Sequence, residues 1–128
     1  MNILIICLFI AAIAPYLAKI PLVYAMNQAG GYNNNYPREQ QASLQGFGAR
    51  ALGAHQNSFE SLLIFSTAIL TALATHTISP FIQGLAIVHI VSRLFYHIFY
   101  LMNWATLRSS IWAIGVLCSL IILGLCIH

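Results

Sequence analysis

Four apolar stretches separated by short polar segments set the pattern along the chain. Three of them approach or exceed the roughly 20 residues that a membrane-spanning helix needs. The stretch Leu62–Ile78 is too short alone, so its span has to include polar residues before Leu62, on a helix that we expect to run from near Ser43 to about Thr77. The predicted fold class is therefore an all-α integral membrane protein, a four-transmembrane-helix bundle in which residues 1–128 form a single domain. We expect the spans at about 3–26, 58–78, 81–102 and 108–127.

The first stretch contains Pro15 and Pro21, which predict a kinked or interrupted helix, because proline removes a backbone donor. It is apolar apart from Lys19, which lies near its end and is expected to reach the interface or the site. A secretory signal is the alternative, since Ala12-Ile13-Ala14 resembles a cleavage site. The stretch has no basic segment before it, and Pro15 would follow the cut directly.

Residues 27–44 form the longest polar segment. Gly30-Gly31, Asn33-Asn34-Asn35 and Pro37 are turn formers, and no hydrophobic period survives among them. We predict an aqueous loop here.

Composition excludes a soluble domain, since 60% of the residues are hydrophobic and only 5% are charged, against the roughly one quarter that is usual in soluble domains. The net charge of +3 is too small for a nucleic-acid binding surface. Cys7, Cys118 and Cys126 lie in apolar stretches without metal-ligand spacing, so we expect small buried side chains and no metal site.

Basic residues give the orientation. Arg38 and Arg108 fall in or beside the first and third connections, and Lys19 and Arg50 flank the first, whereas the second connection and both tails have no Lys or Arg. The positive-inside rule then predicts that both of these connections are cytoplasmic and that both termini lie on the opposite side.

Candidate chemistry is densest between Arg50 and Glu60, directly before the second apolar run. At about 100° per residue, Arg50, Gly53, Asn57 and Glu60 share one helix face, whereas His55 points elsewhere and is expected to pack. A charge at the mouth of a span is costly unless it is paired or used. This face is therefore a candidate wall of a binding site, with Glu60 just inside the hydrocarbon edge.

The third span has a polar stripe on one face, which has to contact protein or a hydrated cavity. One interpretation is that the stripe joins helices through hydrogen bonds. The other is that it binds a ligand, because Arg93 needs an anionic partner and the tyrosine hydroxyls can bind ligand hydroxyls and carboxylates. Glu60 and Arg93 are the opposite charges that both look embedded, so we expect a pair between them, with or without a water or a ligand group in between. The stripe comprises His89, Arg93, Tyr96, His97 and Tyr100.

Arg108-Ser109-Ser110 precedes the fourth span and combines a guanidinium and two hydroxyls with the free N–H groups of a helix start. Such an end attracts anions, including a thiolate, although a serine there is also an ordinary cap. In the predicted topology this segment lies toward the cytoplasmic surface, as do Arg50 to Glu60 and Tyr96 to Tyr100.

These residues resemble the MAPEG family, the membrane-associated proteins in eicosanoid and glutathione metabolism. The segment from Ala54 to Glu60 is similar to the family's Arg-Ala-His-x-Asn-x-x-Glu motif on its second helix. The later matching positions are Arg93, Tyr96, Tyr100, Arg108-Ser109 and Trp112, and the likeness extends over the whole length.

The resemblance implies a homotrimer with glutathione bound between subunits near the cytoplasmic side, where it reacts with lipophilic small molecules from the bilayer. The arginine and serine that begin the fourth helix, here Arg108 and Ser109, would stabilise its thiolate as catalytic residues. The resemblance implies as glutathione contacts Asn57, Glu60 and Tyr100, with Arg50, Arg93 and Tyr96 close by.

The differences between this sequence and the family's usual residues leave two functions open. Gly53 and Gln56 stand where active eicosanoid-type members usually have arginines, and Trp112 replaces a tyrosine, which is closer to small prokaryotic-type members. One reading is a glutathione-dependent transferase or peroxidase acting on lipophilic electrophiles; the other is a non-catalytic lipid-binding or scaffold protein of the same fold. A channel is a more distant alternative, because the polar stripe contains no recognisable filter.

Overall fold

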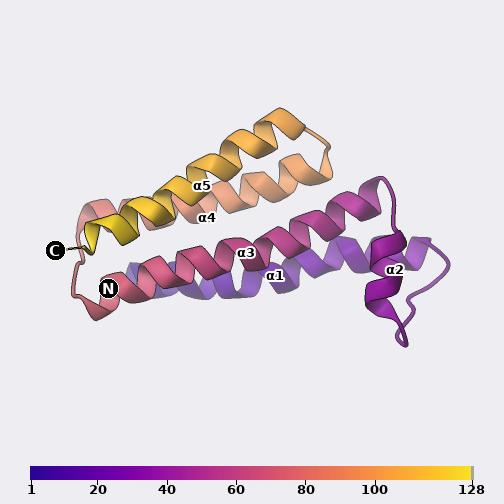
Figure 1. The fold of residues 1–128 in the computed structure, drawn as a ribbon, viewed down its shortest axis with the longest axis horizontal. Helices are drawn as coiled ribbons and strands as arrows, with labels where there is room; N and C mark the ends of the chain where they lie inside the picture. The colour runs from indigo at the N-terminus through magenta and orange to yellow at the C-terminus, as the bar shows by residue number, and fades with distance from the viewer. Residues whose placement is uncertain (128) are drawn as a thin grey trace.

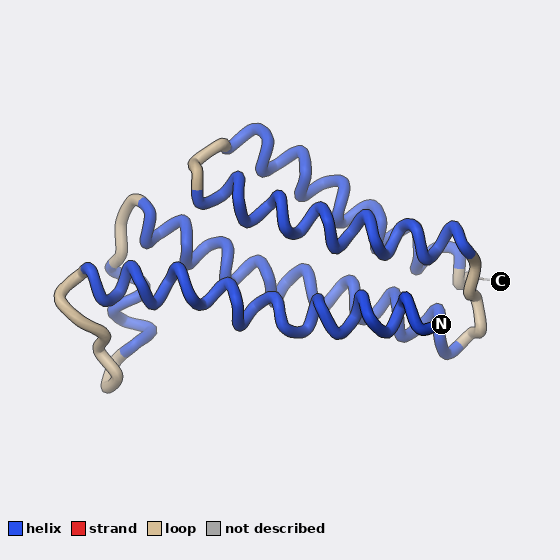
Figure 2. Tube along the Cα trace, turned by 180° about the vertical axis from the view of Figure 1, so that it is seen from behind, coloured by secondary structure: helices blue, strands red, loops and turns tan. Residues whose placement is uncertain are grey.

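The computed structural model describes residues 1–127 as five helices joined by short connections, with no strand in that range. Four helices are long and apolar enough to cross a membrane, and the short α2 lies in the first connection. Antiparallel neighbours place the α1–α3 and α4–α5 connections at one end of the bundle, opposite the N-terminus and the end of α5 (Figures 1 and 2). The helices are α1 (Asn2–Gln28), α2 (Pro37–Ser43), α3 (Phe47–Ala74), α4 (Pro80–Leu101) and α5 (Ala105–Leu125).

Helix α1 continues through both of its prolines, so the predicted interruption does not occur. Pro15 is fully buried against the rest of the bundle. Proline costs about 3 kcal/mol in an isolated helix, but packing on neighbouring helices sustains proline-containing helices in membranes. The expected interruption was therefore wrong, because tertiary packing outweighs the local preference, whereas a kink at the prolines stays a prediction.

The segment 27–44, expected to be a loop, contains α2. Pro37 occupies the first turn, where its fixed φ suits a helix and its missing N–H costs nothing. The Gln40 side chain then binds the backbone of the preceding segment. Its Nε2 donates to the carbonyls of Met26 (3.1 Å) and Gly31 (2.8 Å), and its Oε1 accepts from the N–H of Asn33 (2.9 Å). The polar composition was read correctly as a connection, but its internal order was missed.

Two helix boundaries differ from the expected ones. Helix α3 begins at Phe47, not near Ser43, because Leu44 is extended and Gly46 takes a left-handed φ of 58° that separates α2 from α3. Helix α3 ends at Ala74, two residues before the left-handed His76 (φ 54°). Helix α4 begins as capping rules require, since Ser79 Oγ accepts from the N–H of Ile82 at 3.2 Å and Pro80 follows.

Apolar packing is divided into two clusters along the bundle. The larger one joins the four long helices at the end with the termini and includes Leu4, Phe65, Ile82 and Ile122, all at most 1% exposed. The smaller one, around Leu22, Met26 and Ala51, lies toward the first connection. Cys7, Cys118 and Cys126 are buried and free, as their apolar surroundings in the sequence predicted. Several buried polar side chains come from the middle of α3, α4 and α5, between the two clusters: Ser58, His89, Ser92, Arg93 and Ser119.

Candidate functional site

A continuous series of cationic and aromatic side chains connects α4 to α5. The Arg93 guanidinium lies over the Tyr96 ring, with its Cζ 4.1 Å from the centroid. Tyr96 meets Tyr100 edge to face, with centroids 5.6 Å apart, and the Arg108 guanidinium lies 4.6 Å from the Tyr100 centroid. The structure therefore brings four of the predicted residues into one cluster, which we call the Arg–Tyr cluster: Arg93, Tyr96, Tyr100 and Arg108.

Tyr100 rests on Gly53 of α3, which joins the Arg–Tyr cluster to the second of the predicted segments. A Cβ at Gly53 would lie 2.7 Å from Tyr100 Cζ and closer still to the phenol oxygen. Real Cβ atoms do not approach ring atoms so closely, so a side chain at residue 53 would force the Tyr100 phenol to shift. Gly53 thus has a packing role, since it leaves the space that the Tyr100 ring occupies, and is not simply a position at which an arginine is missing.

Three buried polar atoms have no hydrogen-bond partner among the described residues: Arg50 Nε, Asn57 Oδ1 and Arg93 Nη2. Buried polar groups are normally satisfied, and an unsatisfied one costs about 1–3 kcal/mol. All three belong to residues that the sequence singled out. Their unused capacity is a reason to look for a bound partner of opposite polarity.

Glu60 and Arg93 form no direct salt bridge among the described residues. Glu60 accepts a hydrogen bond from Asn57 Nδ2 at 3.1 Å and is exposed, whereas Arg93 is 9% exposed and stacks on Tyr96. A direct contact was therefore wrong, because equal depth on two helices does not bring two side chains together. A pair joined through a water or a ligand group stays a prediction.

Helix α3 has 28 residues, and every stretch of about 20 residues within it includes residues 55–66. Asn57 and Glu60 therefore belong to the part of α3 that is long enough to span a membrane, and Glu60 is exposed on the single subunit. A carboxylate within a span is costly unless it has a partner.

Helix α5 begins three residues earlier than the span that was expected from residue 108. Trp104 is its N-cap residue, and the N–H of Arg108 donates to the Trp104 carbonyl at 2.9 Å. The free N–H groups of this helix start consequently belong to residues 105–107. Arg108 can offer its guanidinium to an anion, and the exposed Ser109 can offer its hydroxyl. The free backbone N–H groups that were expected at Arg108 and Ser109 lie earlier in the helix, so that part of the expectation was wrong.

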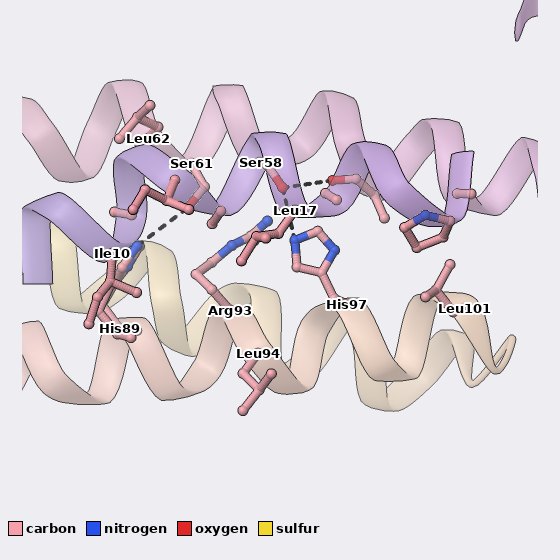
Figure 3. Close-up of a pocket in the computed structure, with 18 residues that line it drawn as sticks. Ile10, Leu17, Ser58, Ser61, Leu62, His89, Arg93, Leu94, His97 and Leu101 are labelled. Carbon is pink, nitrogen blue, oxygen red and sulfur yellow. Dashed lines mark hydrogen bonds between the residues drawn. The ribbon is translucent and has the colours of Figure 1, made fainter. Parts of the chain in front are cut away.

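Beside the Arg–Tyr cluster, a groove of about 560 Å³ lies between α1, α3 and α4 (Figure 3). Its walls are almost entirely apolar, and sequence reasoning missed it because nothing in the Ala- and Leu-rich face of α1 marks a cavity. Arg93 is its one charged lining residue, and its other polar residues are Ser58, Ser61, His89 and His97.

The three histidines of α3 and α4 have structural partners. Nδ1 of His55 bonds the carbonyl of Pro15 at 2.9 Å, which joins α3 to α1 and agrees with the packing role expected for it. Nε2 of His97 meets Ser58 Oγ at 2.9 Å. His89 stacks on Phe65 with centroids 4.0 Å apart and bonds the Gly115 carbonyl at 2.9 Å. Part of the predicted stripe therefore joins helices together.

Within residues 1–127 no group of three or more His, Cys, Asp or Glu side chains could hold a metal ion. The site's chemistry is that of guanidinium, phenol, amide and hydroxyl groups around an apolar groove. These side chains suit an organic anion with an apolar part.

Four membrane-spanning helices with polar side chains between two apolar clusters define an all-helical, multi-pass integral membrane protein. The model of the MAPEG family matches residues 3–128, essentially the whole chain, and the chain belongs to this family. The fold class and the family predicted from the sequence are thereby confirmed. The family includes glutathione transferases and peroxidases as well as non-catalytic members. Searches of curated proteins and of solved structures gave no match.

Proposed function

We propose that this protein is a membrane-bound, glutathione-dependent transferase or peroxidase that acts on lipophilic electrophiles. The observation that carries the proposal is the Arg–Tyr cluster, which gathers two guanidiniums and two phenols from Arg93 to Arg108 in unbroken contact. Family membership supports the same chemistry.

Charge complementarity favours a ligand such as glutathione. Its two carboxylates match the guanidiniums of Arg50 and Arg93, and its ammonium group matches the carboxylate of Glu60. Arg50 Nε and Arg93 Nη2 are donors without a partner, and Asn57 Oδ1 is an acceptor without one. Charge-assisted hydrogen bonds are roughly twice as strong as neutral ones.

The reacting sulfur would be held at the start of α5. A guanidinium beside a thiol favours the thiolate, and the thiolate is the nucleophile. Arg108 would supply that positive charge and Ser109 a hydroxyl donor to the sulfur. The sulfur then forms a bond to the electrophilic atom of a membrane-dissolved substrate, whose leaving group departs with the electron pair.

The exposure of Glu60 supports a homotrimer with sites between subunits. Its side chain is exposed on the single subunit, on a helix long enough to span the membrane, where contact with lipid would be costly. A neighbouring copy, or a ligand between copies, would cover it. By the positive-inside rule the α1–α3 and α4–α5 connections would be cytoplasmic in this arrangement.

The proposal is tested by titrating glutathione into the detergent-purified protein while recording the ultraviolet absorbance of the bound thiolate and the conjugation of a chlorodinitrobenzene. Arg108→Ala should lose the thiolate absorbance and about 100-fold or more in conjugation rate, the usual loss for an electrostatic stabiliser. Arg38→Ala, an arginine in α2, is the matched control and should retain both. No binding at millimolar glutathione would refute the proposal.

A non-catalytic, lipid-binding role on the same fold is the second candidate. It is favoured by the Gly53–Tyr100 contact, which leaves no space for the arginine that active relatives are expected to have at that position. This role predicts lipid that co-purifies and no conjugation in the wild type. Conjugation that is present in the wild type and lost in Arg108→Ala would rule it out.

A further inference from the structure

Lys19 is the only charged side chain of α1, and neither the groove nor the Arg–Tyr cluster includes it. Its side chain is half-buried, and no hydrogen bond or ion pair joins its ammonium group to any residue in the range 1–127. Helix α1 is long and apolar enough to cross a membrane. A charge on such a helix is costly unless it is paired, so Lys19 needs an anionic partner.

The acidic side chains of the same chain do not supply that partner. There are two, of which Glu39 belongs to α2, outside the four candidate spans. His55 Nδ1 bonds the Pro15 carbonyl at 2.9 Å, which puts His55 and Pro15 at one level of the antiparallel pair of α1 and α3. Lys19 is four residues closer than Pro15 to the α1–α3 connection, whereas Glu60 is five residues farther from it than His55. At 1.5 Å per residue, Lys19 and Glu60 are about 13 Å apart along the helix axes, too far for an ion pair.

A second copy of the chain would not remove this mismatch in depth. Oligomers usually have closed cyclic symmetry, and in a bilayer the rotation axis runs along the membrane normal. Rotation about that axis keeps every residue at its own depth, so the Glu60 carboxylates of all copies lie equally far from the level of Lys19. The anion has to come from outside the protein.

The side of α1 beside Lys19 faces outward and has the side chains of a membrane interface. Tyr16, Ile20 and Tyr24 are each at least 60% exposed, and tyrosines gather at the level of the lipid head groups. The Tyr16 ring meets Phe59 edge to face with centroids 6.4 Å apart, and its hydroxyl has no hydrogen bond to a described residue. Lys19 and Tyr16 are three residues apart and are neighbours on the helix surface. An ammonium group and a phenol donor are therefore available together on the outer side of α1.

We infer that Lys19 and the Tyr16 hydroxyl bind the phosphate of an anionic phospholipid in the cytoplasmic leaflet. Phosphate is the anion that the bilayer supplies at the edge of its hydrocarbon core, and a long lysine side chain can extend to it. The α1–α3 connection is the end that the basic residues predict to be cytoplasmic, and anionic lipids give that leaflet its negative charge. A zwitterionic head group is disfavoured, because no acid lies at this level to receive its cation. The inference does not depend on the proposed catalytic function, since it involves neither a thiol nor an electrophile.

The test is native mass spectrometry of the full chain released from nanodiscs that contain phosphatidylcholine and phosphatidylglycerol in equal amounts. The wild type should retain one phosphatidylglycerol per chain, preferred over phosphatidylcholine at least about tenfold, the difference expected for a hydrogen bond to a charged group. Lys19→Met should lose this preference, Lys19→Arg should keep it, and Tyr16→Phe, which removes only the hydroxyl, should weaken it. Equal retention of the two lipids by the wild type would overturn the inference.

A displaced lysine distinguishes a site from general attraction. The double variant Lys19→Met with Ile20→Lys keeps the net charge but moves the ammonium group by about 100° around α1, to a position that is 65% exposed. It should not restore the preference, and full restoration would show that any cation at this depth suffices, which would overturn the site.

Glutathione is the competing anion, and titrating it into the same variants separates the two. Its affinity should be unchanged in Lys19→Met. A loss of glutathione affinity with phosphatidylglycerol retention unchanged would assign Lys19 to the thiol site and overturn the inference. The proposed transferase activity is judged by Arg108→Ala, so the failure of one proposal is distinguishable from the failure of the other.

Discussion

Gly53 determines how closely α3 approaches α4. The Tyr100 phenol occupies the space that a side chain at residue 53 would need. The same ring also contacts Tyr96 and Arg108, which hold it in place. A ring fixed in this way cannot move aside cheaply. The identity of one small residue therefore controls the position of the phenol in the Arg–Tyr cluster.

Gly53→Ala should destabilise the protein by about 1–3 kcal/mol, the usual cost of overpacking, although alanine is the better helix former. Gly84→Ala is the matched control, because its Cβ would meet nothing within 4 Å; it should be neutral or stabilise by up to about 1 kcal/mol. Unfolding in one detergent compares the two. Equal stability of both variants would contradict the contact.

The sequence predicted the residues of the Arg–Tyr cluster but not their contacts. Arg93, Tyr96 and Tyr100 were found because a polar stripe on a membrane helix is conspicuous by its cost. Gly53 was placed on the polar face of its helix and interpreted as a position that lacks an arginine. Its real role depends on which turn of α4 lies opposite it, and that register is a property of helix packing that no single helix encodes.

At the scale of helices, His89 joins three of them. Its ring stacks on Phe65 of α3, its Nδ1 bonds the Gly115 carbonyl of α5, and its backbone belongs to α4. His89→Leu removes the polar contacts within a buried site and should destabilise the fold by about 1–3 kcal/mol. Val88→Leu, next to it on the exposed side of α4, should have little effect in the same unfolding assay. A smaller loss for His89→Leu than for Val88→Leu would contradict the bridging role.

Gly115 is the corresponding close approach between α4 and α5. A Cβ there would lie 2.7 Å from Ser92 Oγ, which is itself engaged with the His89 carbonyl at 2.7 Å. Gly115→Ala should therefore lower stability, by about 1–3 kcal/mol, and Ser92→Ala in the same chain should restore part of it. Gly124→Ala, in open space on the same helix, is the control. Absence of any rescue in the double variant would show that the two side chains do not compete.

Helix boundaries were the least predictable part of the fold. Ser109 and Ser110 look like caps, yet α5 begins at Ala105 after the left-handed Asn103. Helix α2 was overlooked because its neighbours are turn formers, while its order comes from Gln40 bonding residues that are distant in sequence. At α2, contacts between residues distant in sequence overrule local preference, and the start of α5 shows that a serine near a helix start need not be its cap.

The four spans and the family were predictable because bilayer thickness and hydrophobic length act on each helix separately. The groove was not, since it arises from how the α1–α3 pair packs on the α4–α5 pair (Figure 1). Apolar residues that face lipid and apolar residues that face a groove look the same in a sequence. Packing alone separates them.

The basic residues predict the orientation of the whole molecule in the membrane. Lys19, Arg38, Arg50 and Arg108 all lie toward the end with the α1–α3 and α4–α5 connections, and none lies toward the other end. A membrane-impermeant maleimide should therefore label Asn34→Cys and Met102→Cys from the cytoplasmic side and Thr75→Cys from the opposite side. The native cysteines are buried and give a low background. Labelling of Asn34→Cys and Thr75→Cys from the same side would refute the topology.

The exposed Glu60 gives the proposed assembly a test whose sign is informative. If Glu60 faced lipid, Glu60→Leu would remove a costly charge and stabilise the protein by roughly 2–3 kcal/mol. If it faces a neighbouring copy or a ligand held between copies, the same change has to weaken that contact. We expect the wild type to sediment in detergent at three times its subunit mass of 14.1 kDa and Glu60→Leu to lose trimer, glutathione affinity or both. Phe59→Leu, at the adjacent exposed position, is the control. A monomeric wild type, or a more stable Glu60→Leu with assembly unchanged, would mean that this carboxylate has no partner.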